Sequence, residues 1–253
     1  MTQSSVATGE LAVSGSKLHM RQAGSGPPLL YLHDELSSAW SPFLELLSKR
    51  FHVYAPDLPG FGESARPDWI ESIDDAAFLL ADVADALAED GRIAVAGASL
   101  GGWLALEMAL RAGPVVSRVA VAGCPGIAIA GDPPADYFIL TPEERTALFF
   151  NDPSKAPEVD EDHMIRNEQM TARLVWQPRY VSPKLGGRLH RLRAPVLVAW
   201  GRDDRFLSRA HGEALVEGLP DAELTVVSGS GHFPAIEQPQ ALADSFMSFL
   251  VRS

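Results

Sequence analysis

The sequence contains a single cysteine, Cys124, so it can form no intramolecular disulfide and no cysteine-based metal site. Basic residues are also scarce. The chain has 21 of them against 33 acidic residues, which gives a net charge of −12. A phosphate backbone or an anionic lipid surface repels such a chain. We therefore expect a protein that binds neither nucleic acid nor an anionic membrane surface.

Long hydrophobic runs are missing as well. No segment reaches the roughly 18 apolar residues that a membrane-spanning helix needs. The longest uncharged stretch, around Ile93, is interrupted by Ser99 and ends at Glu107. Residues 1–10 are polar and lack the basic start and apolar middle of a signal peptide. These absences predict a cytoplasmic protein without membrane insertion.

The chain does contain enough apolar material for a sizeable core. Its 253 residues are 46% hydrophobic, which allows one large domain or two small ones. Continuous apolar runs alternate with segments of helical periodicity. Such runs are typical of parallel strands that are buried on both faces. The pattern predicts an α/β fold with a mostly parallel sheet, whose strands include residues 29–32, 93–96, 116–122 and 195–200.

One helix is predicted strongly, over residues 72–89. Ser72 followed three residues later by Asp75 is typical of a helix N-terminus. An apolar stripe at helical spacing follows, which indicates one buried face. The remaining acidic side chains of this segment are expected to form a solvated face. They are Asp74, Asp82, Asp85 and Glu89.

Residues 125–193 show no clear strand pattern and are rich in proline. Their charges are segregated, with ten acidic and three basic residues in 125–169 and six basic and no acidic residues in 170–193. A structureless loop of this length is uncommon in a compact domain. We expect a helical cap inserted into a core made of residues 1–124 and 194–253. The charges predict either complementary parts of this cap or a basic surface at a substrate entrance.

A candidate nucleophile lies in Gly97-Ala98-Ser99-Leu100-Gly101, which matches Gly-x-Ser-x-Gly. The motif directly follows a predicted strand and directly precedes a predicted helix. In that context the sharp turn needs glycines at its flanks and lifts the serine hydroxyl above the sheet. The positive N-terminus of the helix stabilises negative charge near the serine.

A serine nucleophile needs a base that is held by a third group. Among seven histidines, only His232 lies in a glycine-rich loop after a late strand. Asp203 and Asp204 both follow the strand 195–200, which gives the chain order Ser, Asp, His. His163, beside acidic residues 160–162, offers only a weak alternative as a metal ligand. No other metal cluster and no phosphate-binding loop are visible, so we expect no metal and no cofactor.

Five motifs in sequence order resemble the α/β-hydrolase superfamily over about residues 11–250. The resemblance implies a sheet of about eight strands, a cap inserted after the sixth strand, and Asp204 rather than Asp203 as the acid. The motifs are Leu32-His33, Asp57-Leu58-Pro59-Gly60-Phe61-Gly62-Glu63-Ser64, the segment from Gly97 to Gly102, Trp200-Gly201-Arg202-Asp203-Asp204, and Gly231-His232-Phe233-Pro234 with Glu237.

The resemblance further implies hydrolysis of a carboxylic ester or related acyl bond through an acyl-enzyme on Ser99, with His232 as base. Two backbone N–H groups would hold the oxyanion, one of them from Leu100. The second belongs to the turn after His33, where the family has His-Gly but this chain has Asp34-Glu35-Leu36. Glu35 is the first candidate for this N–H and Leu36 the next.

The carboxylate of Glu35 is unusual there, because negative charge opposes a developing oxyanion. It could point to solvent or an arginine, bind a substrate group, or belong to a rearranged site. The small-molecule acyl substrate has further candidate contacts, but the oligomeric state is not predicted. These contacts are Asp34, Leu36, Trp176, Arg179 and Phe233.

Three other functions stay open. The turn Trp200-Gly201-Arg202-Asp203-Asp204-Arg205-Phe206 also resembles hydrolases that cleave carbon–carbon bonds in ring-fission products of aromatic degradation. A cofactor-independent lyase or oxygenase could use the same scaffold. A small-molecule receptor without catalysis is the third alternative, although an intact Ser, Asp and His set argues against it.

Overall fold

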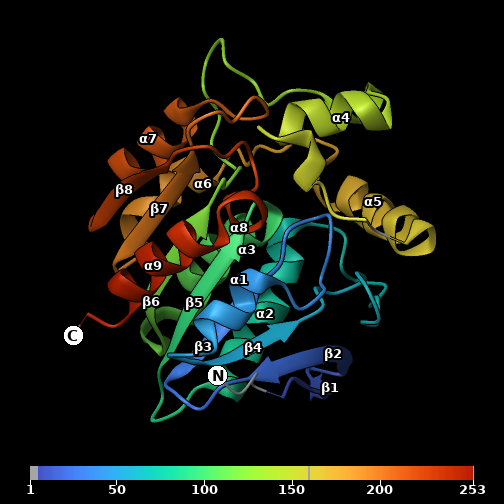
Figure 1. The fold of residues 1–253 in the computed structure, drawn as a ribbon. Coiled ribbons are helices and arrows are strands. Elements are labelled where there is room, and N and C mark those ends of the chain that lie inside the picture. The colour runs from blue at the N-terminus through green and yellow to red at the C-terminus, as the bar shows by residue number, and fades with distance from the viewer. Residues whose placement is uncertain (1–4, 159, 253) are drawn as a thin grey trace.

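The computed structural model describes residues 5–158 and 160–252. Its centre is an eight-stranded sheet with the order β1-β2-β4-β3-β5-β6-β7-β8 (Figure 1). The pairs β1–β2 and β2–β4 are antiparallel, and the other neighbours are parallel. The strands are β1 (Ala7–Val13), β2 (Ser16–Ala23), β3 (Pro28–Leu32), β4 (His52–Pro56), β5 (Ile93–Ala98), β6 (Val116–Ala122), β7 (Val196–Gly201) and β8 (Ala222–Val227).

The apolar runs of the sequence become the middle of this sheet. Every residue of β3, β5 and β7 is buried, as expected for parallel strands covered on both faces. The antiparallel hairpin of β1 and β2 lies at one edge, where most of β1 is exposed. The expected α/β fold with a mostly parallel sheet is confirmed.

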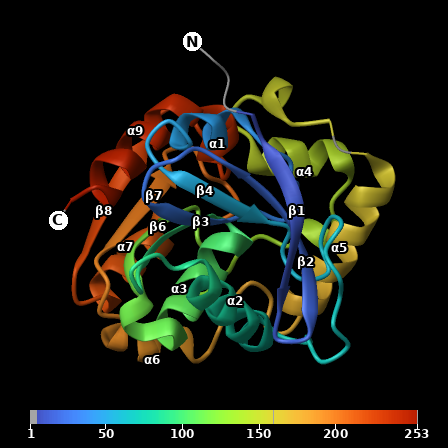
Figure 2. The ribbon, with the colours of Figure 1, turned by 90° about the horizontal axis from the view of Figure 1, so that it is seen from below.

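Helices cover both faces of the sheet and enclose two apolar clusters. Figure 2 shows α1 and α9 on one side of the strands and α2 and α3 on the other. The helices are α1 (Pro42–Leu47), α2 (Ile73–Leu87), α3 (Leu100–Ala112), α4 (Pro142–Phe149), α5 (Glu161–Val175), α6 (Leu185–Arg188), α7 (Arg209–Gly218), α8 (Pro234–Glu237) and α9 (Pro239–Leu250). None of the helices within the described ranges has the length and apolar character for crossing a bilayer.

The segment between β6 and β7 carries α4, α5 and α6, and Figure 1 shows α4 and α5 above the central strands. Its described residues contain no strand, only an isolated bridge between Gly126 and Val181. Apolar side chains of this segment, including Phe149 and Tyr180, belong to the same cluster as the core helices. The division into a core and a separate cap domain stays a prediction.

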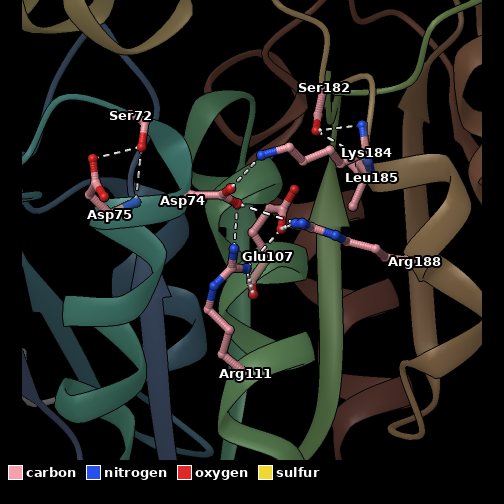
Figure 3. Close-up of polar contacts among 9 residues, drawn as sticks. All are labelled: Ser72, Asp74, Asp75, Glu107, Arg111, Ser182, Lys184, Leu185 and Arg188. Carbon is pink, nitrogen blue, oxygen red and sulfur yellow. Dashed lines mark hydrogen bonds and ion pairs between the residues drawn. The ribbon is translucent and has the colours of Figure 1, made fainter.

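A polar cluster ties this segment to the core (Figure 3). Asp74 of α2 pairs with Arg111 of α3, and its carboxylate also lies 3.5 Å from Lys184 Nζ and 3.4 Å from a guanidinium nitrogen of Arg188. Buried Glu107 pairs with the same Arg111 at 2.8 Å. We call these five residues the Asp74 cluster.

The Asp74 cluster corrects one expectation about charge. The acidic face of α2 was expected to be solvated, but Asp74 is paired because the basic part of the inserted segment folds back against α2 and α3. The helix start is as expected, since Ser72 Oγ accepts from the N–H of Asp75 at 3.2 Å. Within the inserted segment, opposite charges also pair, as in Arg145–Glu168 and Arg179–Asp136.

Candidate active site

Ser99 lies on a strained turn between β5 and α3. Its φ of +46° is unfavourable for a residue with a side chain. The flanking glycines are required by close packing. A Cβ on Gly97 would lie 2.4 Å from the carbonyl oxygen of Gly101, and one on Gly101 would lie 2.1 Å from that of Leu32. The turn therefore holds the Ser99 hydroxyl at the carboxyl end of the central strand.

Ser99, His232 and Asp204 form a continuous hydrogen-bonded chain. Ser99 Oγ lies 2.8 Å from Nε2 of His232, and Nδ1 of that ring lies 2.8 Å from Oδ2 of Asp204. The other carboxylate oxygen of Asp204 accepts from the N–H groups of Phe206 (2.9 Å) and Leu207 (3.0 Å). All three side chains of the chain are buried. The arrangement fixes the imidazole with Nε2 facing the hydroxyl.

The sheet brings these residues together from distant parts of the sequence. Ser99 follows β5, Asp204 follows β7 and His232 follows β8, and these strands belong to the parallel part of the sheet. The carboxyl ends of parallel strands meet at one edge, where ligands commonly bind. Asp203, the competing acid, uses its N–H to donate to the Ser230 carbonyl at 2.9 Å, and its side chain does not reach His232.

The electrostatic surroundings favour the charged form of His232. Burial disfavours protonation of the imidazole and would lower its pKa. The negative charges of Asp204, Glu35 and Asp34 outweigh burial and raise the pKa of His232 above its ordinary value. At neutral pH the ring is therefore more readily protonated than a free histidine.

The turn after β3 is held by His33 and Asp34. The ring of His33 accepts from the N–H of Leu58 at 2.9 Å and contacts the carbonyl of Asp34 on its other side. The carboxylate of Asp34 accepts from the N–H groups of Leu36 (2.9 Å) and Ser37 (3.2 Å), as in an Asx turn. Burial and the neighbouring Glu35 raise the pKa of Asp34 to about 7. Asp34 therefore closes the turn that was predicted to face the substrate.

The Glu35 side chain turns inward, onto the predicted nucleophile. Its Oε1 accepts from Ser99 Oγ at 3.1 Å, and its Oε2 accepts from the N–H of Leu100 at 3.4 Å. The Glu35 carboxylate therefore points neither to solvent nor to an arginine, which was one of the three expectations. The N–H of Glu35, predicted to hold an oxyanion, has no acceptor among the described residues.

A cavity of about 480 Å³ opens above Glu35 and Leu36, between α4 and α5. Ser99 itself has no exposed surface and lies beneath the Glu35 carboxylate. Most of the lining is apolar, with one ion pair, Arg145–Glu168, in the wall. The lining residues are Glu35, Leu36, Tyr137, Pro142, Arg145, Thr146, Phe149, Phe150, Ala156, Pro157, Met164, Glu168 and Thr171.

The other predicted substrate contacts lie elsewhere. Trp176 is half exposed, and Arg179 stacks over its ring while pairing with Asp136, so neither lines the cavity. Phe233 is fully buried and packs edge-on against the ring of His232. Leu36 is the one of these candidates that reaches the cavity wall.

Two tyrosines of the inserted segment belong to the site but were not predicted. The hydroxyl of Tyr180 donates to Oε1 of Glu35 at 3.3 Å, and it lies 3.2 Å from the hydroxyl of Tyr137. Tyr180 is buried and has a positive φ of +51°. No sequence pattern marks either residue, because Tyr137 lies in a single 3-10 turn and Tyr180 in a turn, and the position of both depends on packing against the core.

The described part of the chain brings no metal-binding group together. Within residues 5–158 and 160–252, no three His, Cys, Asp or Glu side chains are arranged to hold a metal ion. His163, the weak metal candidate, contacts the carboxylates of Asp160 and Glu63, both at 3.1 Å.

The fold is that of an α/β hydrolase. A family model described as the Alpha/beta hydrolase family matches residues 23–245, and the chain belongs to this family. The protein is therefore a hydrolase by family, in agreement with the resemblance in the sequence motifs.

Curated relatives have two kinds of activity in their names. A 2-hydroxy-6-oxo-6-phenylhexa-2,4-dienoate hydrolase of Burkholderia cepacia is 27% identical, over 98% of this chain and 96% of its own length. A pimeloyl-[acyl-carrier protein] methyl ester esterase of Nitrosomonas europaea is 26% identical, over 91% of this chain and 98% of its own. The solved structure of a 2-hydroxy-6-oxo-6-phenylhexa-2,4-dienoate hydrolase from Rhodococcus sp. strain RHA1 is 26% identical, with a TM-score of 0.78 over 97% of this chain and 98% of that one.

Proposed function

We propose that the protein is a serine hydrolase that cleaves a carboxylic ester or related acyl bond through an acyl-enzyme on Ser99. The observation that carries the proposal is the buried chain of hydrogen bonds from Ser99 through His232 to Asp204. A serine at its free pKa is a weak nucleophile, and this arrangement supplies the base and its orienting carboxylate.

In the acylation step, Ser99 Oγ attacks the substrate carbonyl carbon while its proton passes to Nε2 of His232. Asp204 holds Nδ1 and stabilises the imidazolium that forms. When the tetrahedral intermediate collapses, the carbon–oxygen bond to the alcohol breaks and His232 returns the proton to this leaving group. Water then attacks the acyl-enzyme with His232 as base, which releases the acid and regenerates Ser99.

Backbone N–H groups stabilise the negative charge of the intermediate. The N–H of Leu100 follows the nucleophile at the N-terminus of α3 and supplies one donor. The N–H of Glu35, which has no acceptor among the described residues, supplies the other. Each such donor contributes about a hundredfold or more to the rate in serine hydrolases.

The cavity supports an apolar acyl or alcohol group in the substrate. Its wall is mostly aliphatic and aromatic, and its volume of about 480 Å³ lies within the range of small-molecule sites. Thr171 is part of the cavity wall, but its buried hydroxyl adds no accessible polar group there.

Labelling with a fluorophosphonate probe tests this function. We expect a covalent adduct on Ser99 in the wild-type protein and none in Ser99→Ala, with mass spectrometry of the peptide as the measurement. Circular dichroism of both proteins controls for folding. A folded wild-type protein that remains unlabelled would contradict the serine hydrolase.

Cleavage of a carbon–carbon bond in a ring-fission product is the second candidate. Two of the relatives reported above are dienoate hydrolases by name. Parallel assays with p-nitrophenyl butyrate and a 2-hydroxy-6-oxo-dienoate separate the two functions. We expect the larger kcat/KM for the ester, because a dienoate carboxylate would meet the Glu35 carboxylate close to Ser99.

The pH dependence of ester hydrolysis follows from the surroundings of His232. The ring must be neutral to accept the Ser99 proton, and nearby carboxylates raise its pKa above the ordinary value of about 6.5. The protonated, inactive form therefore persists to higher pH. We expect kcat/KM to rise with pH through a midpoint above about 6.5. Initial rates between pH 5 and 9 measure it, and a midpoint below 6 would contradict the expectation.

A further inference from the structure

The Glu35 carboxylate occupies the position that an oxyanion needs during catalysis. Its Oε2 takes the N–H of Leu100, and its Oε1 contacts the hydroxyl of Ser99. An oxyanion formed on the substrate would require the same N–H group, in the same place. The carboxylate and a reacting carbonyl oxygen therefore exclude each other.

The same carboxylate competes for the Ser99 proton. A serine hydroxyl has a single hydrogen, which can be donated either to Oε1 of Glu35 or to Nε2 of His232. When Glu35 accepts this hydrogen, the short contact between Ser99 and His232 requires the imidazole to donate from Nε2, while its Nδ1 already donates to Asp204. A ring that donates from both nitrogens carries a positive charge. A charged imidazole cannot act as the base. Glu35 thus favours a resting state in which neither the hydroxyl nor the ring is ready to react.

The carboxylate is held in place by more than Ser99. Glu35 is almost fully buried, and the hydroxyl of Tyr180 donates to its Oε1. Tyr137 extends this contact through its hydroxyl. Burial and the negative charge of Glu35 raise the pKa of the Tyr180 phenol well above its ordinary value, so it remains a donor.

The cavity offers the space into which the side chain can leave. Glu35 forms part of its lining, together with Tyr137 and Arg145. The guanidinium of Arg145 lies 5.5 Å from the centre of the Tyr137 ring. Rotation about the side-chain bonds of Glu35 would move the carboxylate from the Leu100 N–H into this space without a change in the backbone of the turn.

We propose that Glu35 is a displaceable internal ligand of the oxyanion site and that its charge selects neutral acyl groups over anionic ones. This inference rests on the proposed serine hydrolase and adds the determinant of its substrate class. A substrate reaches Ser99 only by displacing the carboxylate into the cavity. An acyl group that carries its own carboxylate must then share the cavity with Glu35, and the two charges repel each other in surroundings of low polarity.

Tyr180 is a positioning residue in this scheme, because it acts through Glu35. Its hydroxyl stabilises the inward position of the carboxylate. Removal of the hydroxyl in Tyr180→Phe should therefore accelerate acylation by a neutral probe, in the same direction as a change at Glu35. In a Glu35→Ala background the same substitution should have no further effect, since the group that it holds is absent.

The test compares wild type with Glu35→Gln, which removes the charge, and Glu35→Ala, which removes the occupant. Exposed Glu213, paired with Arg209 on α7, provides the control Glu213→Gln with the same change in net charge. Labelling by a neutral fluorophosphonate should be faster by about tenfold or more in both Glu35 variants. The kcat/KM ratio of p-nitrophenyl hydrogen succinate to p-nitrophenyl butyrate should rise by a similar factor. The control should match wild type.

A pH profile adds a readout that a purely structural role would not change. The charged groups that raise the pKa of His232 are Asp204, Glu35 and Asp34, so the acidic midpoint of kcat/KM should move to lower pH in Glu35→Gln. Thermal melting of each variant monitors folding.

The outcomes separate this inference from the proposed function. If the folded wild-type protein is not labelled, the serine hydrolase itself fails. If wild type is labelled but both Glu35 variants are slower and hydrolyse the neutral ester less well, the carboxylate takes part in catalysis and the displaceable ligand is overturned. An unchanged succinate-to-butyrate ratio would refute the charge selection.

Discussion

Asp204→Asn is expected to lower kcat for ester hydrolysis by about ten-thousand-fold while leaving the fold intact. One oxygen of Asp204 faces Nδ1 of His232, and the other accepts two backbone N–H groups. An asparagine keeps its oxygen on the two N–H groups and turns its NH₂ group toward the ring. The imidazole then places its proton on Nε2, so it can no longer accept the proton of Ser99.

Asp203→Asn is the matched control. It makes the same chemical change one residue earlier, at a side chain that does not reach His232. Steady-state kinetics with p-nitrophenyl butyrate should give wild-type rates for this variant. Equal losses in the two variants would show that the acid of the site has been misassigned.

Arg111→Ala is expected to lower the free energy of unfolding by about 3 kcal/mol, because it leaves buried charge without its nearest partner. Glu107 is 1% exposed and pairs with Arg111 at 2.8 Å, whereas Arg188 is 3.8 Å away. Asp74 loses a partner in the same substitution. Urea denaturation at pH 7 measures the change.

The exposed pair Arg209–Glu213 gives a control for this prediction. Both side chains are more than half exposed, so Arg209→Ala should cost less than about 0.5 kcal/mol.

The loss of stability in Arg111→Ala also depends on pH. Burial would raise the pKa of Asp74, but Arg111, Arg188 and Lys184 lower it below its ordinary value. That stabilisation is present above about pH 4 and disappears as pH falls through the lowered pKa, so the two proteins should converge in acid.

The sequence predicts those parts of the molecule that local signals determine. Buried parallel strands need continuous apolar runs, and the turn at Ser99 needs its two glycines because backbone atoms approach so closely. The candidate residues Ser99, Asp204 and His232 each follow a strand, so the topology of the sheet places them at one edge. Local sequence and global fold agree at these points.

The parts that sequence reasoning missed depend on contacts over long distances. Tyr180 is 145 residues away from Glu35 in the sequence, and its backbone follows no periodic pattern. The pairing of Asp74 similarly depends on where residues 184–188 fold back. For Glu35 a signal existed, because an acidic residue replaces the small residue that the family has near the oxyanion. The direction of its side chain could not be read from that departure.

Substitutions in the two helices that line the cavity, α4 and α5, are expected to affect catalysis differently. The loop of His232 is tethered to the end of α4, since the N–H of His232 donates to the carbonyl of Phe149 at 2.7 Å. Glu237 adds a second tether, by accepting from the N–H groups of Gly231 (2.6 Å) and Asp152 (2.8 Å). Directed-evolution libraries around α4 would therefore alter turnover along with substrate range. Libraries on the α5 wall, at Met164 and its neighbours, would vary the substrate range while leaving these tethers in place.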